Sequence, residues 1–306
     1  MRTLSQTLDK LRFGPAQSHA NLHAFPLLAD DRPGMGYLVL DDAAASGAVR
    51  ITESGNPGRV PAVQVTNDCD EPVFLLDGQE LIGAMQDRVL NTSVLVPPRA
   101  SLVAPVSCVE AARWDPETAE FSPSRQLHFA RGRALRVSEV TRTLIHHGEA
   151  SGDQVEVWAA IEERAMAMNV TSSTRSHNSL FDNVSRALDG FVAAIKPARR
   201  QVGVVFAIGI EIVGCDLFDS PGTLAASYAK LVRSAALDAL VSSAGGPPPI
   251  GDAAWFMDRV RRSRTLRFAS AGLGEDIRLC ADRLSGGALI AGGRVVHLCA
   301  FDVEEA

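Results

Sequence analysis

The chain has few of the features that mark disulfide-stabilised, exported or membrane-spanning proteins. Its five cysteines form no CxxC pair and are odd in number, so neither a disulfide framework nor a zinc knuckle is indicated. No apolar run approaches the roughly 18–20 residues that span a bilayer, and the longest candidate, 202–215, is broken by Glu211 and three glycines. The N-terminus lacks the charged-then-apolar pattern of a signal peptide. We therefore expect reduced thiols, a cytoplasmic location and no membrane partner.

An excess of positive charge is missing as well. The chain has 30 Lys and Arg against 36 Asp and Glu, a formal net charge of −6. A duplex-binding surface normally needs a clustered basic excess, so nucleic acid is not an expected partner, and RNA binding is a distant alternative. Arginines gather only locally, at 199–200 and between 259 and 267. This balance is compatible with a small anionic ligand.

What the chain does have is the composition of a globular protein. Its 306 residues are 46% hydrophobic and 22% charged. Short β runs fill the region from residue 35 to about 110, whereas helices and strands mix after about 153, without the regular alternation of a doubly wound parallel sheet. We predict an α+β fold. A β-rich half (1–115), with an antiparallel sandwich- or barrel-like sheet, packs as one compact body with a mixed helix and strand half (116–306).

Hydrophobic periodicity and turn residues give the individual elements. Strands are expected at 36–40, 49–53, 60–66, 72–76, 79–83, 88–96, 101–109, 202–208, 211–215, 265–270, 275–281, 286–291 and 294–301. Helices are expected at 2–12, 42–46, 153–168, 179–195, 221–240 and 252–262, and residues 115–152 are expected to be irregular. Asp77-Gly78 predicts a two-residue hairpin. Ser220 is predicted to cap the helix that Pro221 begins.

Polar residues between Asp77 and Trp114 interrupt segments that are otherwise typical of buried strands. They supply carboxylates, amides, guanidinium groups, a thiol and an indole: Asp77, Glu80, Gln86, Arg88, Asn91, Cys108, Glu110, Arg113 and Trp114. Cys108 and Glu110 are two apart on a predicted strand, so both side chains point to one face. Gathered near one end of a sheet, such groups would orient a polar ligand, and an arginine fork suits phosphate or carboxylate.

These residues divide into two sets of candidates. The candidate catalytic residues are Asp77, Glu80, Cys108, Glu110 and His297, and the candidate ligand-binding residues are Gln86, Arg88, Asn91, Arg113 and Trp114. A nucleophilic Cys108 would need a nearby base, for which His297 on the last predicted strand is the candidate. No metal-binding spacing occurs, and the residues indicate no particular cofactor.

Each of these residues also has a structural interpretation. Asp77 suits a tight turn, and Glu80 with Arg88 can form a simple cross-strand ion pair. A cysteine in a strand is more often a small buried hydrophobic residue than a nucleophile, and a packed histidine is the default for His297. Trp114 suits the core or its rim. The alternative to an enzyme is therefore a non-catalytic binding or homo-oligomerising module whose polar cluster is structural.

Three segments make the sequence similar to a known family. They are 74–81 (FLLDGQEL), 83–91 (GAMQDRVLN) and 105–114, which contains PVSCVE and ends in Arg-Trp. They resemble the ARPP-type domain, named for its association with ADP-ribosylglycohydrolase and the rhodanese-phosphatase superfamily. The resemblance covers most of the chain and implies binding or processing of a nucleotide-derived anion near ADP-ribose or NAD metabolism, without a catalytic mechanism. Met85 and Asp87 stand where the family usually has lysine and asparagine.

Overall fold

The computed structural model describes residues 2–30, 34–55, 62–115, 118–243 and 245–303. These ranges contain eight helices and eighteen strands, and the strands pair antiparallel except for β4 with β7. The fold is mixed α+β, as predicted from the sequence. In the described part of the chain, no helix has the length and apolar character that crossing a membrane requires.

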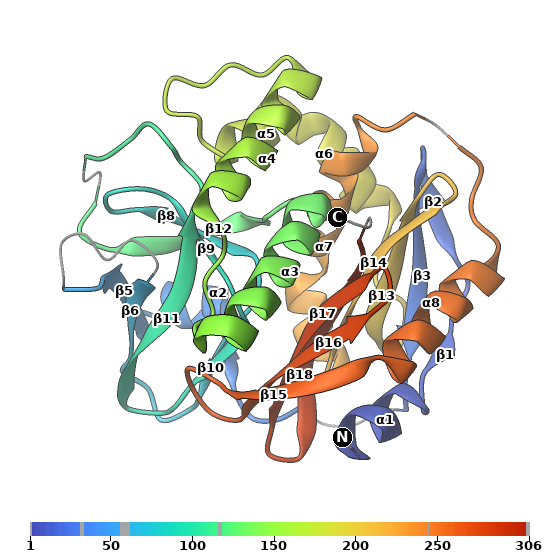
Figure 1. Cartoon of the computed structure of the whole chain (residues 1–306), viewed down its shortest axis with the longest axis horizontal. Helices are drawn as coiled ribbons and strands as arrows, with labels where there is room; N and C mark the ends of the chain where they lie inside the picture. The colour runs from blue at the N-terminus through green and yellow to red at the C-terminus, as the bar shows by residue number, and fades with distance from the viewer. Residues whose placement is uncertain (1, 31–33, 56–61, 116–117, 244, 304–306) are drawn as a thin grey trace.

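The largest sheet has nine strands and draws them from both ends of the chain (Figure 1). Its path runs through β1 (Arg12–Phe13), β3 (Leu22–Leu28), β13 (Gln201–Ile208), β14 (Glu211–Phe218), β18 (Arg294–Asp302), β17 (Leu284–Ala291), β16 (Glu275–Ala281) and β15 (Arg264–Ala269), with β2 (Gln17–His19) beside β3. Strands β13 and β17 are buried along their whole length. A strand covered on both faces needs such continuous burial.

Helices cover both faces of this sheet. The helices of the described chain are α1 (Arg2–Leu8), α2 (Leu40–Ala45), α3 (Ala130–His147), α4 (Gln154–Met168), α5 (Asn178–Asn183), α6 (Ser185–Ala194), α7 (Pro221–Ala239) and α8 (Ile250–Arg262). Of these, α2 packs against the smaller sheets instead. On one face, α1 and α8 pack through residues such as Leu8 and Phe256, whereas α6 and α7 share the core of the other face. Helix α7 begins as predicted, with Ser220 accepting from the backbone N–H of Thr223.

The β-rich part consists of two smaller sheets around a common core. A six-stranded sheet contains β12 (Phe121–Leu127), β8 (Gln79–Gly83), β9 (Arg88–Leu90), β11 (Ala100–Cys108), β6 (Ala62–Asn67) and β5 (Val49–Glu53), and a three-stranded sheet contains β10 (Val94–Val96), β7 (Val73–Leu75) and β4 (Leu38–Val39). Apolar side chains of both sheets and α2 pack together, which gives a sandwich-like arrangement. Strand β12 comes from the predicted half 116–306 but joins this six-stranded sheet, whereas β1–β3 come from the predicted half 1–115 but join the large sheet. The two predicted halves therefore exchange strands.

Residues 115–152 are not irregular, contrary to expectation. They contain β12 and the 18-residue helix α3. The helix was missed because its buried side carries Arg133 and Arg136 beside Val137 and Val140. These charges interrupt the hydrophobic period, and their partners come from distant parts of the chain.

Strand β3 was also missed, because Pro26 lies within its apolar run. Proline cannot donate to a β ladder and normally argues against a central strand. In the structure, Pro26 falls between the residues of β3 that pair with β1 and those that pair with β2. On this edge no strand pairs with Pro26, so the N–H group that proline lacks is not needed there.

The predicted hairpin at Asp77-Gly78 is wrong. Strand β7 pairs with β10 and β4, whereas β8 pairs with β9 and β12. A tight turn does form: the N–H of Gln79 donates to the carbonyl of Leu76 at 3.0 Å, and Gly78 has a φ of +80°. This turn carries the chain from one sheet to the other instead of closing a hairpin.

Three further boundaries differ from the predicted ones. The strand expected at 88–96 is two strands, β9 and β10, in different sheets. The helix expected at 179–195 is divided at Val184 into α5 and α6. The first two residues of the strand expected at 60–66 lie outside the described residues.

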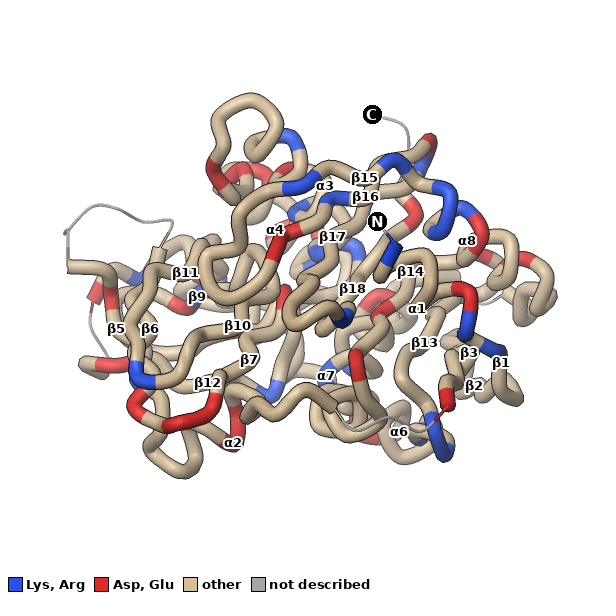
Figure 2. The backbone as a smooth tube through the Cα atoms, turned by 90° about the horizontal axis from the view of Figure 1, so that it is seen from below, with Lys and Arg blue, Asp and Glu red and all other residues tan. Residues whose placement is uncertain are grey.

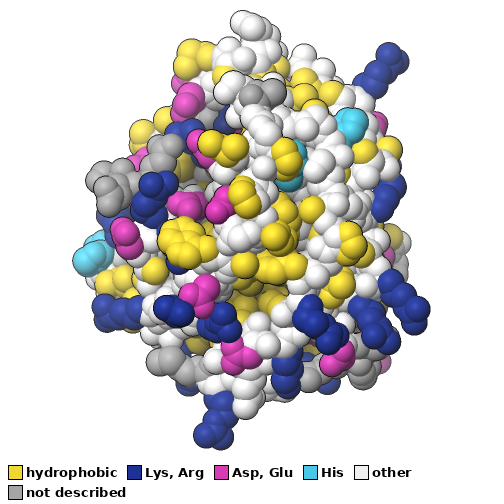
Figure 3. All heavy atoms as spheres, turned by 90° about the vertical axis from the view of Figure 1, so that its right-hand side faces the viewer, with side chains coloured by type: hydrophobic (Ala, Val, Ile, Leu, Met, Phe, Trp, Pro, Cys, Tyr) yellow, Lys and Arg dark blue, Asp and Glu magenta, His cyan; other side chains and the backbone are white. Residues whose placement is uncertain are grey.

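Opposite charges are interspersed along the described chain (Figure 2). Figure 3 shows hydrophobic side chains near the middle of the face on the right-hand side of Figure 1, with Lys and Arg around them. Helix α8 lies on this side and exposes most of Trp255. The guanidinium of Arg259 lies over the Trp255 ring, 4.7 Å from its centroid. The cation partly covers this large exposed aromatic.

A buried ion-pair network joins α3 to the turn after β7 and to β14. Both Nη atoms of Arg136 donate to the carboxylate of Asp77, at 3.3 and 3.0 Å. Arg133 forks onto Asp216 at 3.0 and 2.7 Å, and its Nε lies 3.5 Å from Asp77. All four side chains are almost fully removed from solvent. Buried charges are tolerated only when each has such partners.

Removing Arg136 should therefore destabilise the protein strongly. In Arg136→Leu, the Asp77 carboxylate stays buried with only its longer contact to Arg133, and we expect the free energy of unfolding to fall by about 3–5 kcal/mol. Arg142 is the control, because it lies on the same helix but pairs with Glu139 at the surface. Arg142→Leu should cost about 1 kcal/mol or less. Urea unfolding measures both losses, and equal losses would contradict the role of the network.

Candidate functional site

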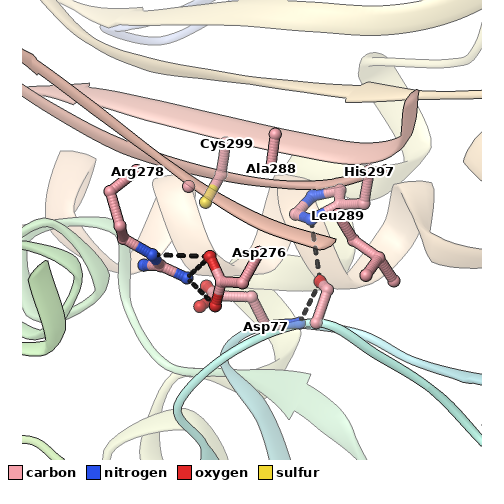
Figure 4. Close-up of a pocket in the computed structure, with 9 residues that line it drawn as sticks. Asp77, Asp276, Arg278, Ala288, Leu289, His297 and Cys299 are labelled. Carbon is pink, nitrogen blue, oxygen red and sulfur yellow. Dashed lines mark hydrogen bonds and ion pairs between the residues drawn. The ribbon is translucent and has the colours of Figure 1, made fainter. Parts of the chain in front are cut away.

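A narrow hollow lies between the β-rich part and the large sheet (Figure 4). It encloses about 220 Å³, including the solvent at its mouth. Its lining residues are Asp77, Ser93, Asp276, Arg278, Gly287, Ala288, Leu289, His297 and Cys299. Asp77 and Ser93 come from the β-rich part, and the others come from the neighbouring strands β16, β17 and β18. Two regions far apart in the sequence therefore build one site.

His297 lies between a serine and an aspartate. Its Nδ1 is 2.8 Å from Ser93 Oγ, and its Nε2 is 3.1 Å from Asp216 Oδ1. The backbone N–H of Asp77 donates to the same Ser93 Oγ at 3.0 Å. A carboxylate only accepts hydrogen bonds, so Nε2 of the imidazole donates to Asp216, and Nδ1 is the ring nitrogen that can accept the Ser93 proton. The result is a continuous serine–histidine–aspartate chain of hydrogen bonds.

Asp216 stays ionised despite its burial. Burial alone would raise the pKa of this carboxyl, but the charge of Arg133 and the hydrogen bonds from His297 and Arg133 outweigh it and lower the pKa to about 2. The pKa of Asp77 is lowered in the same way, because the charges of Arg136 and Arg133 outweigh the effect of burial. Both residues are therefore carboxylates at neutral pH.

Arg278 has one guanidinium nitrogen without a hydrogen-bond partner among the described residues. Its Nε and Nη2 each donate to the carboxylate of Asp276 at 2.7 Å, whereas its buried Nη1 has no partner. The side chain is 3% exposed. A Cβ on Gly287 would lie 2.9 Å from Nη1, so the glycine leaves space beside this nitrogen. Buried N–H groups nearly always have a partner, and this donor belongs to a side chain that lines the hollow.

The charges around the hollow are balanced. Arg133, Arg136 and Arg278 face the three carboxylates of Asp77, Asp216 and Asp276, which pair with them. Burial also raises the pKa of the Cys299 thiol, which is neutral. The hollow consequently has no uncompensated negative charge to repel an anion.

Cys108 lies in a different cluster, against β9. Its sulfur contacts Nη1 of Arg88, which also donates to Gln86 Oε1 at 3.2 Å. Burial raises the pKa of the Cys108 thiol to about 11, although the charge of Arg88 acts in the opposite direction. The thiol is therefore protonated at neutral pH, whereas a nucleophilic cysteine reacts as its thiolate. Both ring nitrogens of His297 are bonded to other residues, and the structure does not pair this histidine with Cys108.

The remaining predicted residues also lie outside the lining of the hollow. Glu110 accepts from Arg113 Nε at 2.6 Å, and Glu80 pairs with His177 at 2.8 Å. Asn91 accepts from Ser107, and Trp114 is half exposed. Of the ten residues that the sequence singled out, Asp77 and His297 line the hollow.

Ser93, Asp216 and Arg278 were not predicted as site residues. Arg278 and Asp216 carried a usable signal. Arg278 lies two residues after the opposite charge of Asp276 on one strand, and Asp216 is a carboxylate within another, apolar strand. Ser93 follows β9 in a short connection and has no such signal. Within the described ranges, no three His, Cys, Asp or Glu side chains are grouped so as to hold a metal ion.

Comparison with known proteins gives one match. The model of a family described as the ARG and Rhodanese-Phosphatase-superfamily-associated Protein domain (ARPP-1) matches residues 10–301. This range includes every residue that lines the hollow. No curated protein and no solved structure matches the chain.

Asp87, beside the Cys108 cluster, has an unusual protonation behaviour. Its carboxylate accepts from the N–H of Gly83 at 3.0 Å and pairs with Arg113 at 3.0 Å. Burial raises its pKa to about 6, and the neighbouring charges of Glu80 and Glu110 act in the same direction. The hydrogen bond from Gly83 and the charge of Arg113 only partly oppose this rise. Folded chains therefore retain this proton at a pH where unfolded chains have lost it.

Stability should consequently fall as the pH rises through this window. The folded-state pKa is above the unfolded one, so the folded state binds more protons between about pH 4 and pH 6. We expect the stability of the wild type, relative to Asp87→Asn, to fall by about 2 kcal/mol across that window and then to level off. Urea unfolding at several pH values measures the difference, and a flat or rising difference would contradict the raised pKa of Asp87.

Proposed function

The chain belongs to the ARPP-1 family, and we propose that it binds a small anionic ligand, such as the phosphate of a nucleotide-derived molecule, in the hollow beside Arg278. The family is associated with the ADP-ribosylglycohydrolase and rhodanese-phosphatase superfamilies. That association is compatible with a ligand from ADP-ribose or NAD metabolism. The proposal itself depends on the chemistry of the hollow.

The observation that carries it is the unpartnered Nη1 of Arg278. Hydrogen bonds from a guanidinium group to phosphate or carboxylate are charge-assisted and about twice as strong as neutral ones. Asp276 holds the other two nitrogens at 2.7 Å, so the guanidinium is already oriented before a ligand arrives. The bound anion would supply the partner that this buried donor lacks.

The size of the hollow limits what enters it. The volume of about 220 Å³ includes open solvent, and the space enclosed between the side chains admits little more than one water-sized group. An oxygen of one anionic group would enter there, with the rest of the ligand remaining outside. Ala288 and Leu289 line the apolar side of the hollow, and Ser93 adds a hydroxyl.

A second function is favoured by the burial of the other clusters. Glu80, Arg88, Asn91 and Cys108 are at most 1% exposed, and each has a partner inside the protein. These residues act as parts of a structural network in a non-catalytic binding or self-associating module. This alternative predicts that anionic probes leave the protein unchanged.

Binding of inorganic phosphate, AMP and ADP-ribose distinguishes the two functions. A probe at 100 times its dissociation constant should add about 2.7 kcal/mol of stability, which a thermal-shift assay detects. Arg278→Lys keeps a charge beside Asp276 but loses the planar fork, so titration calorimetry should show binding at least about 10-fold weaker. The control is Arg267→Lys on β15, where the arginine is exposed and pairs with Glu275. If no probe binds, or if both variants bind as the wild type does, the proposal is wrong.

Gly287 allows a test that leaves the arginine in place. In Gly287→Ala the new methyl group would lie 2.9–3.1 Å from the guanidinium atoms, which Asp276 prevents from withdrawing freely. We expect weaker phosphate binding in calorimetry because Nη1 is displaced or covered. Gly251→Ala, on α8 with open space around it, should bind as the wild type does. Unchanged binding in Gly287→Ala would place the anion elsewhere.

A further inference from the structure

We propose that Ser93 is a nucleophile for which His297 is the general base and Asp216 the orienting carboxylate, and that the chain hydrolyses small esters bearing an anionic group. The inference rests on the proposed function in one respect, because the same hollow and Arg278 would bind the anionic part of the substrate. The roles of Ser93, His297 and Asp216 are inferred from three separate observations.

The first observation is the geometry of the three side chains. The separations of 2.8 Å from Ser93 Oγ to His297 Nδ1 and 3.1 Å from His297 Nε2 to Asp216 Oδ1 lie in the range of hydrogen bonds between a nucleophile, its base and the orienting group. Such a triad is recognised by geometry and by roles, and not by the order of its residues in the chain. Here Nδ1 faces the serine and Nε2 faces the aspartate.

The second observation is the position of the serine. Ser93 and His297 both line the hollow, so the serine lies beside the proposed ligand space. Figure 4 shows the ring of His297 there. The backbone N–H of Asp77 donates to Ser93 Oγ and leaves the hydroxyl proton directed at His297. An incoming electrophile therefore meets an oxygen whose proton already has an acceptor.

The third observation is the support behind the histidine. Arg133 holds both carboxylate oxygens of Asp216, at 3.0 and 2.7 Å, so the carboxylate is fixed where it bonds His297. Because Asp216 remains ionised, it can stabilise the imidazolium that forms when His297 takes a proton. His297 also packs against the rings of Phe74 and Phe218, which restrict its orientation.

The reaction balances with water as the co-substrate. Ser93 Oγ attacks the ester carbon, its proton moves to His297 Nδ1, and the bond from that carbon to the leaving oxygen breaks as the leaving oxygen takes this proton. Water then attacks the acyl-serine and gives a proton to His297. The bond to Ser93 Oγ breaks, and the returned proton restores the hydroxyl.

The test uses a small, uncharged dialkyl fluorophosphate, whose fluoride is displaced when serine oxygen bonds to phosphorus. Peptide mass spectrometry should locate the adduct on Ser93 in the folded wild type, and Ser93→Ala should abolish it. His297→Gln should lower the labelling rate by about 100-fold or more, because the general base is lost. Ser107→Ala is the matched control, since Ser107 is also buried and also bonds a side chain, Asn91 at 2.8 Å. It should be labelled as fast as the wild type.

The rate of labelling should also rise with pH, because a general base acts only in its unprotonated form, and this rise should be absent in His297→Gln. A structural role for the histidine would not produce that profile. No adduct on Ser93 in the folded wild type, or equal rates in wild type and His297→Gln, overturns the inference. Because the probe is uncharged, labelling of the wild type does not require the anion to be bound. Labelling without phosphate binding would therefore refute only the proposed function, whereas phosphate binding without labelling would refute only the role of Ser93.

Discussion

The carboxylate of Asp77 occupies the position at which the β-rich part, helix α3 and the large sheet are fixed to one another. It lies in the turn that carries the chain from one small sheet to the other, and two arginines of one helix reach it. Arg136 also donates to the carbonyl of Leu90, so the same guanidinium fixes the end of β9. Arg133 continues the network to Asp216 on β14, which in turn bonds His297. The orientation of the histidine therefore depends on interactions that begin in a distant turn.

Burying this network has an electrostatic consequence for the hollow beside it. Charges that are removed from water interact over short distances with little screening, so each carboxylate needs its arginine in a defined geometry. The same lack of screening strengthens any hydrogen bond that a ligand makes to Arg278 or Ser93. The same low-dielectric environment therefore stabilises the structural ion pairs and would strengthen the contacts of a bound ligand.

Elements with one apolar side were predictable from the sequence. Helix α4 and strand β5 occur within a residue of their expected bounds, because their burial follows the periodicity of a helix or a strand. Helix α3 was not predictable in this way, since its inward side contains arginines whose partners are chosen by tertiary structure. The candidate residues were found because polar groups interrupted apolar runs, and a long shared motif indicated the family. Their division into separate clusters was not predictable, because the turn at Asp77 does not reveal that β7 and β8 belong to different sheets.

The place of β3 in the large sheet has a consequence for how the chain folds. Its partner β13 comes most of the chain later, so this edge of β3 stays unpaired until β13 has been synthesised. Contacts of such long sequence separation form slowly, and an apolar strand that waits unpaired is prone to aggregate with other chains. Pro26 does not block this edge, because its carbonyl accepts from the N–H of Gly14 on the opposite side of the strand, at 2.8 Å, and its missing donor lies on that same side. The edge of β3 that waits for β13 therefore keeps its donors, and its exposure during synthesis is a cost of joining two distant segments in one sheet.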